Sequence, residues 1–295
     1  MYKKLFIIFF ITLIIFISPQ SYGPDINNYY KFNLDSPSLT RLPFTYFLYL
    51  SNQYIDLAYL TTVFFMLLLY FVKVENFGDI FILIILLIFM LFFSYAANSL
   101  LGNIIRQGIA TIMLIAVLEY RSWLLRYFFL FNASIFHPGS VVAGLLFPQS
   151  TLKKDSILTF KSKVILGVVF ISIVWLLVPD RVLNIMKRDI MGDLNGYVFV
   201  SFLIILRLSI LFLTRNISQK EFIILCLGGM VFGVFGEFGQ RILISLIFVL
   251  DYFVITRFYR SKKIVLFYIT ILFFEGLMRY FVIGNFWGPH AFKLS

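Results

Sequence analysis

The sequence predicts an all-α polytopic integral membrane protein that forms a single transmembrane domain over residues 1 to 295. The first reason is composition, because 61% of the residues are hydrophobic, 20% are aromatic and only 13% are charged, with a mean hydropathy of +0.95. Such values are not typical of a water-soluble domain of this length. The second reason is that apolar runs recur along the whole chain, many of them close to the length that crosses about 30 Å of hydrocarbon. We expect about ten transmembrane helices.

The predicted spans follow the apolar runs in chain order. They cover residues 4 to 18, 57 to 72, 79 to 95, 103 to 118, 122 to 136, 164 to 178, 196 to 213, 221 to 236, 240 to 256 and 264 to 282. The first run follows Lys3 and Lys4 like the core of a signal peptide, but no small-x-small cleavage site comes after it, so we expect a retained helix. Residues 138 to 147 are apolar but too short to span alone, which predicts a re-entrant or broken helix after His137.

Two segments between the runs are predicted to lie outside the cytoplasm. With the amino terminus in the cytoplasm, most of the 25 Lys and Arg residues fall on the cytoplasmic side, as the positive-inside rule requires. Residues 19 to 56 then form an extracytoplasmic loop. Residues 180 to 195 carry apolar side chains at near-helical spacing, which predicts an outer amphipathic helix on the membrane interface.

Polar side chains interrupt the apolar runs at one predicted depth. A charged side chain in a lipid-facing helix costs roughly 2.5 to 3.5 kcal/mol, so such residues usually face a cavity or a partner. The residues close to the extracytoplasmic ends of different predicted spans are Arg106, Gln107, His137, Glu237, Gln240, Arg241 and Arg279. The outer loop adds Asp25, a carboxylate, and Tyr29 and Tyr30, which offer stacking faces. This convergence predicts a polar site that opens at the outer membrane face.

Composition also argues against several kinds of ligand. The net charge of +11 is spread over short loops, so no basic domain is expected to bind nucleic acid. The two histidines, His137 and His290, stand without a carboxylate cluster, so neither a metal site nor a cofactor is expected. Cys226 is the only cysteine and excludes an internal disulfide.

Structural roles compete with functional ones for most of these residues. In a structural role, Arg106 would anchor the end of its helix by extending its guanidinium to the lipid headgroups. In a structural role, the His137 imidazole would hydrogen-bond a backbone carbonyl that Pro138 leaves without a donor. Two carboxylates have an arginine four residues later, so Glu237 would pair with Arg241 and Glu275 with Arg279. Arg207 lies deeper and is expected to pair with Asp251 on another helix, in a structural role.

Four short motifs carry a resemblance to a known family. The strings GNIIRQGIA, IFHPGSVVAGLLF, YGPDINNYY and GEFGQRI together resemble the EpsG family of bacterial polysaccharide polymerases, which is related in role to Wzy. The resemblance implies a metal-independent membrane glycosyltransferase of GT-C-like architecture in the bacterial cytoplasmic (inner) membrane. Its implied reaction joins undecaprenyl-diphosphate-linked oligosaccharide repeats into O-antigen, capsule or exopolysaccharide at the outer face. The family's motif positions fall on Arg106, Gln107, His137, Arg241 and Arg279.

The implied reaction assigns roles to the predicted site. Guanidinium groups of Arg106 and Arg241 would stabilise the departing diphosphate. His137 would act as the base for the acceptor hydroxyl, with Glu237 or Asp25 as the alternatives. Expected substrate-binding residues are Gln107, Gln240, Arg279, Asp25, Tyr29 and Tyr30. The expected partners are the lipid-linked glycan donor and acceptor, membrane lipid, and a chain-length regulator or flippase.

Two other functions remain open from the sequence. A membrane acyltransferase that modifies surface glycans would also use a histidine and an arginine, but its histidine is expected on the cytoplasmic side. A non-enzymatic flippase or transporter of lipid-linked oligosaccharide would need cationic residues spread along a central cavity. A glycan ligase, related to the polymerases, usually carries a larger outer loop.

Overall fold

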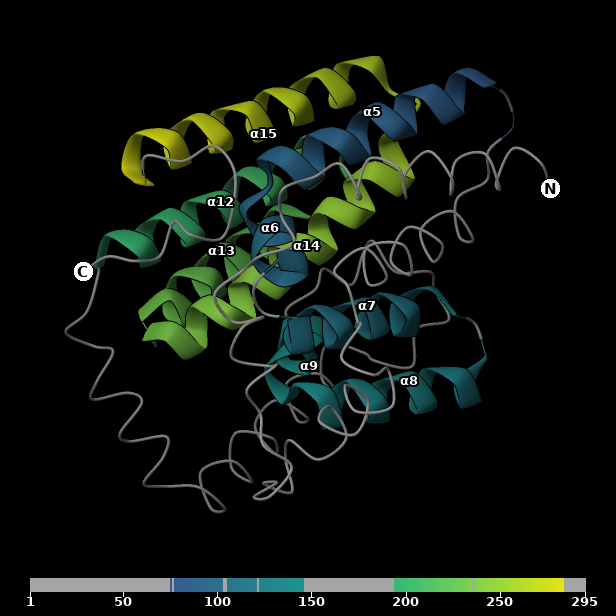
Figure 1. Ribbon diagram of the computed structural model, residues 1–295, viewed down its shortest axis with the longest axis vertical. Helices are drawn as coiled ribbons and strands as arrows, with labels where there is room; N and C mark the ends of the chain where they lie inside the picture. The colour runs from purple at the N-terminus through teal and green to yellow at the C-terminus, as the bar shows by residue number, and fades with distance from the viewer. Residues whose placement is uncertain are drawn as a thin grey trace.

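The computed structural model describes residue 75 and residues 77 to 102, 105 to 120, 122 to 145, 194 to 234 and 236 to 283. These residues form helices (Figure 1). In chain order the helices are α5 (Phe77–Phe93), α6 (Tyr95–Gly102), α7 (Ile105–Glu119), α8 (Trp123–Phe136), α9 (Pro138–Leu145), α12 (Leu194–Leu213), α13 (Gln219–Val234), α14 (Gly236–Phe258) and α15 (Lys262–Ile283).

The predicted architecture of about ten membrane spans is wrong for this part of the chain. None of the helices described has both the length and the apolar character that crossing a membrane demands. Helices α5, α7, α8 and α13 have 17, 15, 14 and 16 residues, so at about 1.5 Å per residue each falls short of about 30 Å of hydrocarbon. The longer helices α12, α14 and α15 carry ionisable side chains within their middle turns, at Arg207, Asp251 and Glu275.

Each predicted apolar run in the described ranges is nevertheless a helix, with ends displaced by a few residues. Helix α6 was not predicted as a separate element. Its residues follow Ser94, where the backbone leaves the helical conformation between α5 and α6. The Ser94 hydroxyl accepts a hydrogen bond from the Ala97 backbone N–H at 3.4 Å, as an N-capping serine does. Ser94, a polar residue at the end of the apolar run, therefore separates α5 from α6.

Helix α14 occupies the centre of the described structure. Helices α5 and α15 lie side by side on one side of it, and α7, α8 and α9 lie on the other (Figure 1). Helices α12 and α13 also pack on α14. All residues from 242 to 250 of α14 are buried, so its apolar side chains are covered around the whole circumference of the helix. Burial of this apolar surface is the main favourable term that holds the other helices around α14.

The chain breaks between α8 and α9 at His137, where the sequence predicts a broken helix. A residue before proline is driven from helical into extended backbone, and His137 has φ −159° and ψ 99°. Pro138 is then the first residue of α9, a position where its missing N–H is not needed. The His137 backbone N–H still donates to the Ala133 carbonyl at 2.9 Å, and the His137 carbonyl accepts from Ser140 N–H at 3.1 Å. The break is therefore a defined corner with its backbone groups paired.

Candidate functional site

Three separated parts of the chain meet where α7 and α14 begin and α8 turns into α9. The Gln107 side-chain Nε2 donates hydrogen bonds to the Arg241 backbone carbonyl and to the Ser245 hydroxyl, the latter at 2.7 Å. Gln107 and Arg241 are 134 residues apart in the sequence. The structure therefore joins the Arg-Gln motif of α7 to the Gln-Arg motif of α14 by a direct side-chain contact.

Three hydroxyl groups surround this contact. The Thr111 hydroxyl lies 3.0 Å from the Ser245 hydroxyl, 3.3 Å from the Ser140 hydroxyl and 2.8 Å from the Gln107 backbone carbonyl. The Ser140 hydroxyl lies 3.4 Å from Ser245 Oγ and 3.4 Å from the Gln107 carbonyl. We call Gln107, Thr111, Ser140 and Ser245 the hydroxyl cluster, and all four are fully buried. The cluster ties α7, α9 and α14 together by polar contacts inside an apolar core.

The Gln107 side-chain carbonyl is the exception in the cluster. Its Oε1 is buried and accepts no hydrogen bond. Leaving a buried acceptor without a donor costs about 1 to 3 kcal/mol, and buried polar atoms of native proteins are paired in the great majority of cases. An uncompensated amide oxygen at a predicted binding residue is therefore a place where a ligand donor gains affinity.

His137 lies next to the cluster. Its residue is 9% exposed, and the ring is close to the neighbouring Gly139: a methyl group added at Gly139 would come 2.9 Å from His137 Cε1. The same methyl group would lie 3.7 Å from Ile242 Cγ1 on α14. The imidazole therefore lies by the helix residue that directly follows Arg241, so the structure brings Gln107, His137 and Arg241 into one neighbourhood.

The other predicted site residues are placed less completely. Arg241 and Gln240 are partly exposed on α14. Arg106, Glu237 and Arg279 belong to α7, α14 and α15, but their side chains lie outside the part of the chain that the structure describes. Several other predictions also lie outside the described part of the chain. They are the extracytoplasmic loop of residues 19 to 56 with Asp25, Tyr29 and Tyr30, and the amphipathic helix up to residue 193. The predicted spans 4 to 18, 57 to 72 and 164 to 178 lie outside it as well. Residues 194 and 195 begin α12.

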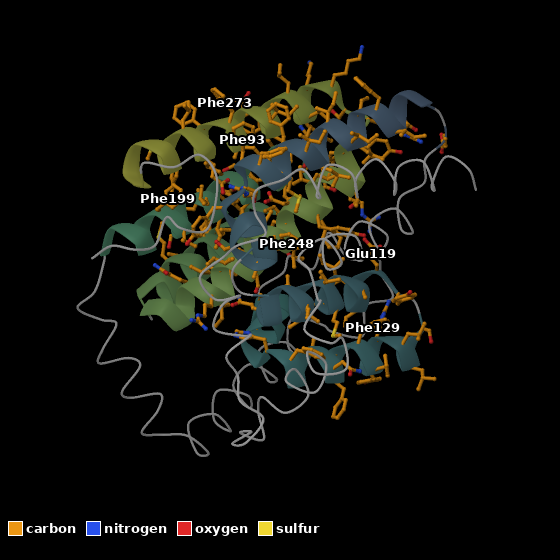
Figure 2. The ribbon with its side chains drawn as sticks, in the orientation of Figure 1. Phe93, Glu119, Phe129, Phe199, Phe248 and Phe273 are labelled. Carbon is orange, nitrogen blue, oxygen red and sulfur yellow. The ribbon has the colours of Figure 1, made fainter. Side chains whose placement is uncertain are left out.

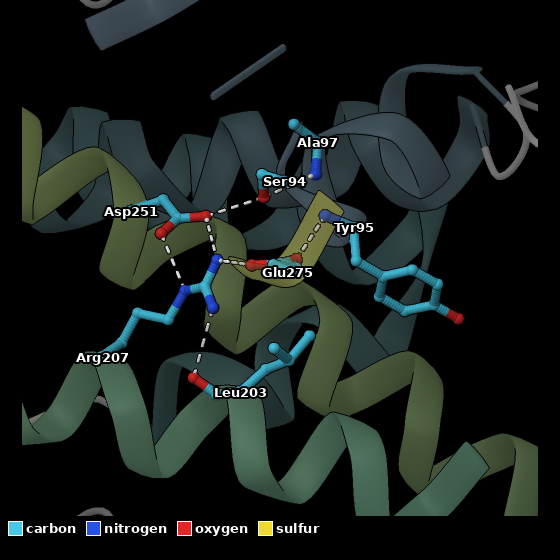
Figure 3. A network of polar contacts seen from close by, with 7 residues as sticks. All are labelled: Ser94, Tyr95, Ala97, Leu203, Arg207, Asp251 and Glu275. Carbon is cyan, nitrogen blue, oxygen red and sulfur yellow. Dashed lines mark hydrogen bonds and ion pairs between the residues drawn. The ribbon is translucent and has the colours of Figure 1, made fainter. Parts of the chain in front are cut away.

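A second polar group lies deeper, between α12, α14 and α15 (Figure 3). The predicted pair is confirmed: Arg207 Nε donates to Asp251 Oδ1 at 2.9 Å, with both side chains 0% exposed. The sequence analysis expected Glu275 to pair with Arg279. In the structure, Glu275 Oε2 accepts a hydrogen bond from Arg207 Nη2, a partner that was not expected. The signal available in the sequence was that Arg207, Asp251 and Glu275 are ionisable residues in the middle of apolar runs. Such residues usually pair with one another.

The start of α6 contributes to the same group. The Tyr95 backbone N–H donates to Glu275 Oε1, and the Ser94 hydroxyl donates to Asp251 Oδ2 at 2.9 Å. Arg207 carries one positive charge and faces two carboxylates, those of Asp251 and Glu275. The N-terminus of a helix carries roughly half a positive charge, so the start of α6 offsets part of the remaining negative charge. Burial raises the pKa of the Glu275 carboxyl above its usual value, and the neighbouring Asp251 acts in the same direction. Arg207 and the Tyr95 N–H oppose that shift.

Apolar side chains are exposed on several of the described helices, among them α8, α12, α13 and α15. On α15 these include Leu266, Phe273 and Phe274. Phe273 is labelled in Figure 2. On α8 the exposed residues Leu124, Phe128 and Phe131 are spaced four and three apart, so they share one face of the helix. His137 caps the C-terminal end of α8. Comparison with protein-family models, curated proteins and solved structures finds no match to this chain.

Proposed function

We propose that the protein polymerises undecaprenyl-diphosphate-linked oligosaccharide repeats into a surface polysaccharide, at the outer face of the bacterial cytoplasmic membrane. The observation that carries the proposal is the contact of the Gln107 amide with the Arg241 carbonyl beside the His137 corner. Three motifs that are remote in the sequence, and that carry the resemblance to EpsG-like polymerases, supply these residues. Their meeting at the ends of α7, α8 and α14 is what a shared site requires.

The proposed chemistry uses two groups, the imidazole of His137 and the guanidinium of Arg241. The acceptor hydroxyl attacks the anomeric carbon of the donor, a glycosidic C–O bond forms, and the C–O bond to the diphosphate breaks. His137 accepts the hydroxyl proton, since imidazole has a pKa suited to a base near neutral pH. The Arg241 guanidinium stabilises the charge that develops on the departing undecaprenyl diphosphate. Donor activation resides in the diphosphate, so the reaction needs no metal or cofactor.

The surface of α8 supports a lipid-bearing substrate. Phe131 is 66% exposed and Leu124 is 63% exposed, and both lie on one face of α8, the helix whose C-terminal end is capped by His137. A polyprenyl chain gains about 0.8 kcal/mol for each CH₂ group removed from water. A tail along this face would bring its diphosphate to the corner between α8 and α9, close to the proposed base.

The test is a polymerisation assay on the purified full-length protein. Lipid-linked repeats extracted from the producing cells are incubated with the protein, and products are separated by size. A ladder of longer glycans is expected, with the yield lowered about 100-fold or more in Arg241→Ala and His137→Ala. Arg257→Ala is the matched control, because Arg257 lies in the last turn of the same helix and is paired with Glu119 at 3.3 Å. A normal ladder from folded Arg241→Ala would refute the proposal.

A further inference from the structure

The orientation of the Gln107 amide is determined by its neighbours. A side-chain amide can turn over, which exchanges its oxygen and its NH₂ group. At Gln107 one of the two positions faces the Arg241 carbonyl, which can only accept, so the NH₂ group must occupy that position. The second Nε2 proton goes to Ser245 Oγ at 2.7 Å. The oxygen Oε1 is thereby directed away from both partners.

The hydroxyl protons of the cluster find their acceptors within it. The shortest contact of Thr111 Oγ1 is with the Gln107 backbone carbonyl, at 2.8 Å. Ser245 Oγ accepts from Gln107 Nε2 and from Thr111 Oγ1, the latter at 3.0 Å, and it lies 3.4 Å from Ser140 Oγ. Ser140 Oγ has the Gln107 carbonyl at 3.4 Å. Among the described residues, Oε1 has no hydrogen-bond partner.

The chemistry of an amide oxygen limits what that ligand group is. It accepts from a neutral hydroxyl or N–H and repels anionic oxygens. An ionised diphosphate offers no proton, so its partner is a cationic side chain such as that of Arg241 and not Gln107 Oε1. Sugars carry hydroxyl groups, and amino sugars also carry an acetamido N–H. The acceptor at Gln107 therefore suits the glycan part of a lipid-linked substrate and not its lipid diphosphate.

We infer that Ser245, together with Thr111, is a positioning residue that holds the Gln107 amide so that Oε1 accepts a hydrogen bond from a hydroxyl or N–H of the glycan. The inference rests on the proposed function and assigns part of its substrate recognition. Ser245 and Thr111 do not touch substrate. Ser245 supplies the acceptor for Gln107 Nε2, and Thr111 donates to the Ser245 hydroxyl that holds this acceptor in place.

The test measures binding of two probes to the full-length protein, using native mass spectrometry or a quenching titration. One probe is the lipid-linked repeat from the producing cells, and the other is undecaprenyl diphosphate without sugar. Ser245→Ala is expected to weaken binding of the repeat about tenfold, the effect of one hydrogen bond, and to leave binding of undecaprenyl diphosphate unchanged. Thr111→Val preserves the side-chain shape, removes the second hydroxyl and is expected to act in the same direction.

The control is Ser201→Ala. Ser201 is also a buried serine, but its hydroxyl donates to the Gly229 carbonyl at 3.4 Å between α12 and α13, outside the cluster. If Ser245→Ala and Thr111→Val weaken both probes equally, or neither, the positioning role is refuted while the proposed function stands. A wild-type protein that binds neither probe refutes the proposed function, and this inference with it.

Discussion

Arg207 Nε donates to Asp251 Oδ1 at 2.9 Å, and Arg207 Nη2 lies 3.4 Å from the other oxygen of the same carboxylate. This two-point contact joins α12 to α14 where neither side chain reaches solvent. A third Arg207 nitrogen, Nη1, donates to the Leu203 carbonyl at 3.4 Å within α12. A buried charge held in this way stabilises the fold only while all its partners remain, because desolvation of both ions has already been incurred.

Replacement of this arginine is expected to be costly. Arg207→Met should lower the free energy of unfolding by roughly 3 to 5 kcal/mol, since it leaves two buried carboxylates without their cation. Urea denaturation followed by circular dichroism measures the change. Arg257→Met is the control, because its ion pair with Glu119 is partly exposed and is worth about 1 kcal/mol or less. Equal stabilities of the two variants would show that the buried pair contributes nothing special.

The raised pKa of Glu275 predicts a pH dependence of stability. The folded protein binds the Glu275 proton more tightly than the unfolded chain does, so the associated stability is fully present below the unfolded pKa, near 4.5, and is lost as pH rises through the raised folded pKa. Tyr268 nearby remains neutral in this window, because burial raises its pKa well above the usual range. Glu275→Gln should remove this contribution, whose slope is at most about 1.4 kcal/mol per pH unit.

The measurement is urea denaturation at a series of pH values, with the variant subtracted from wild type. The free energy of unfolding of wild type relative to Glu275→Gln should be highest near pH 4.5 and should fall as the pH rises through the folded pKa of Glu275. A difference that is flat, or that grows with pH, would contradict the raised pKa of Glu275.

Two glycines are expected to respond to alanine in opposite directions. A methyl group at Gly108 would overlap the Leu100 backbone carbonyl, which cannot move without shifting α6, so Gly108→Ala should destabilise by about 1 to 3 kcal/mol. At Gly229 the nearest atom would be Ile204 Cγ2 at 3.6 Å, an ordinary contact. Gly229→Ala should therefore stabilise by about 0.5 to 1 kcal/mol through helix propensity. Thermal unfolding of both variants tests this difference in sign.

Substitution of Gly139 tests the position of the proposed base. In Gly139→Ala the new methyl group would lie 2.9 Å from His137 Cε1, so the imidazole must rotate away. The ladder yield is expected to fall at least tenfold, since a misplaced base loses much of its contribution to proton transfer. The imidazole signals of the two histidines by NMR report the displacement. An unmoved His137 signal together with a lowered yield would mean that the methyl group acts elsewhere.

Local features of the chain determined which segments are helical and where one of them breaks. The apolar runs are helices because their residues favour that backbone and bury their side chains, and the break at His137 follows from the proline after it. The pairing of Arg207 with Asp251 was also predictable, because two opposite charges in apolar segments have few other ways to be satisfied.

Only the tertiary structure decided how those helices are used. Hydropathy marked where helices lie, but the helices described lack the combination of length and apolar character that the predicted spans required. Glu275 reaches Arg207 and Gln107 reaches Ser245 across 68 and 138 residues. No periodicity or spacing encodes such contacts, because they depend on the packing of helices that are formed far apart along the chain.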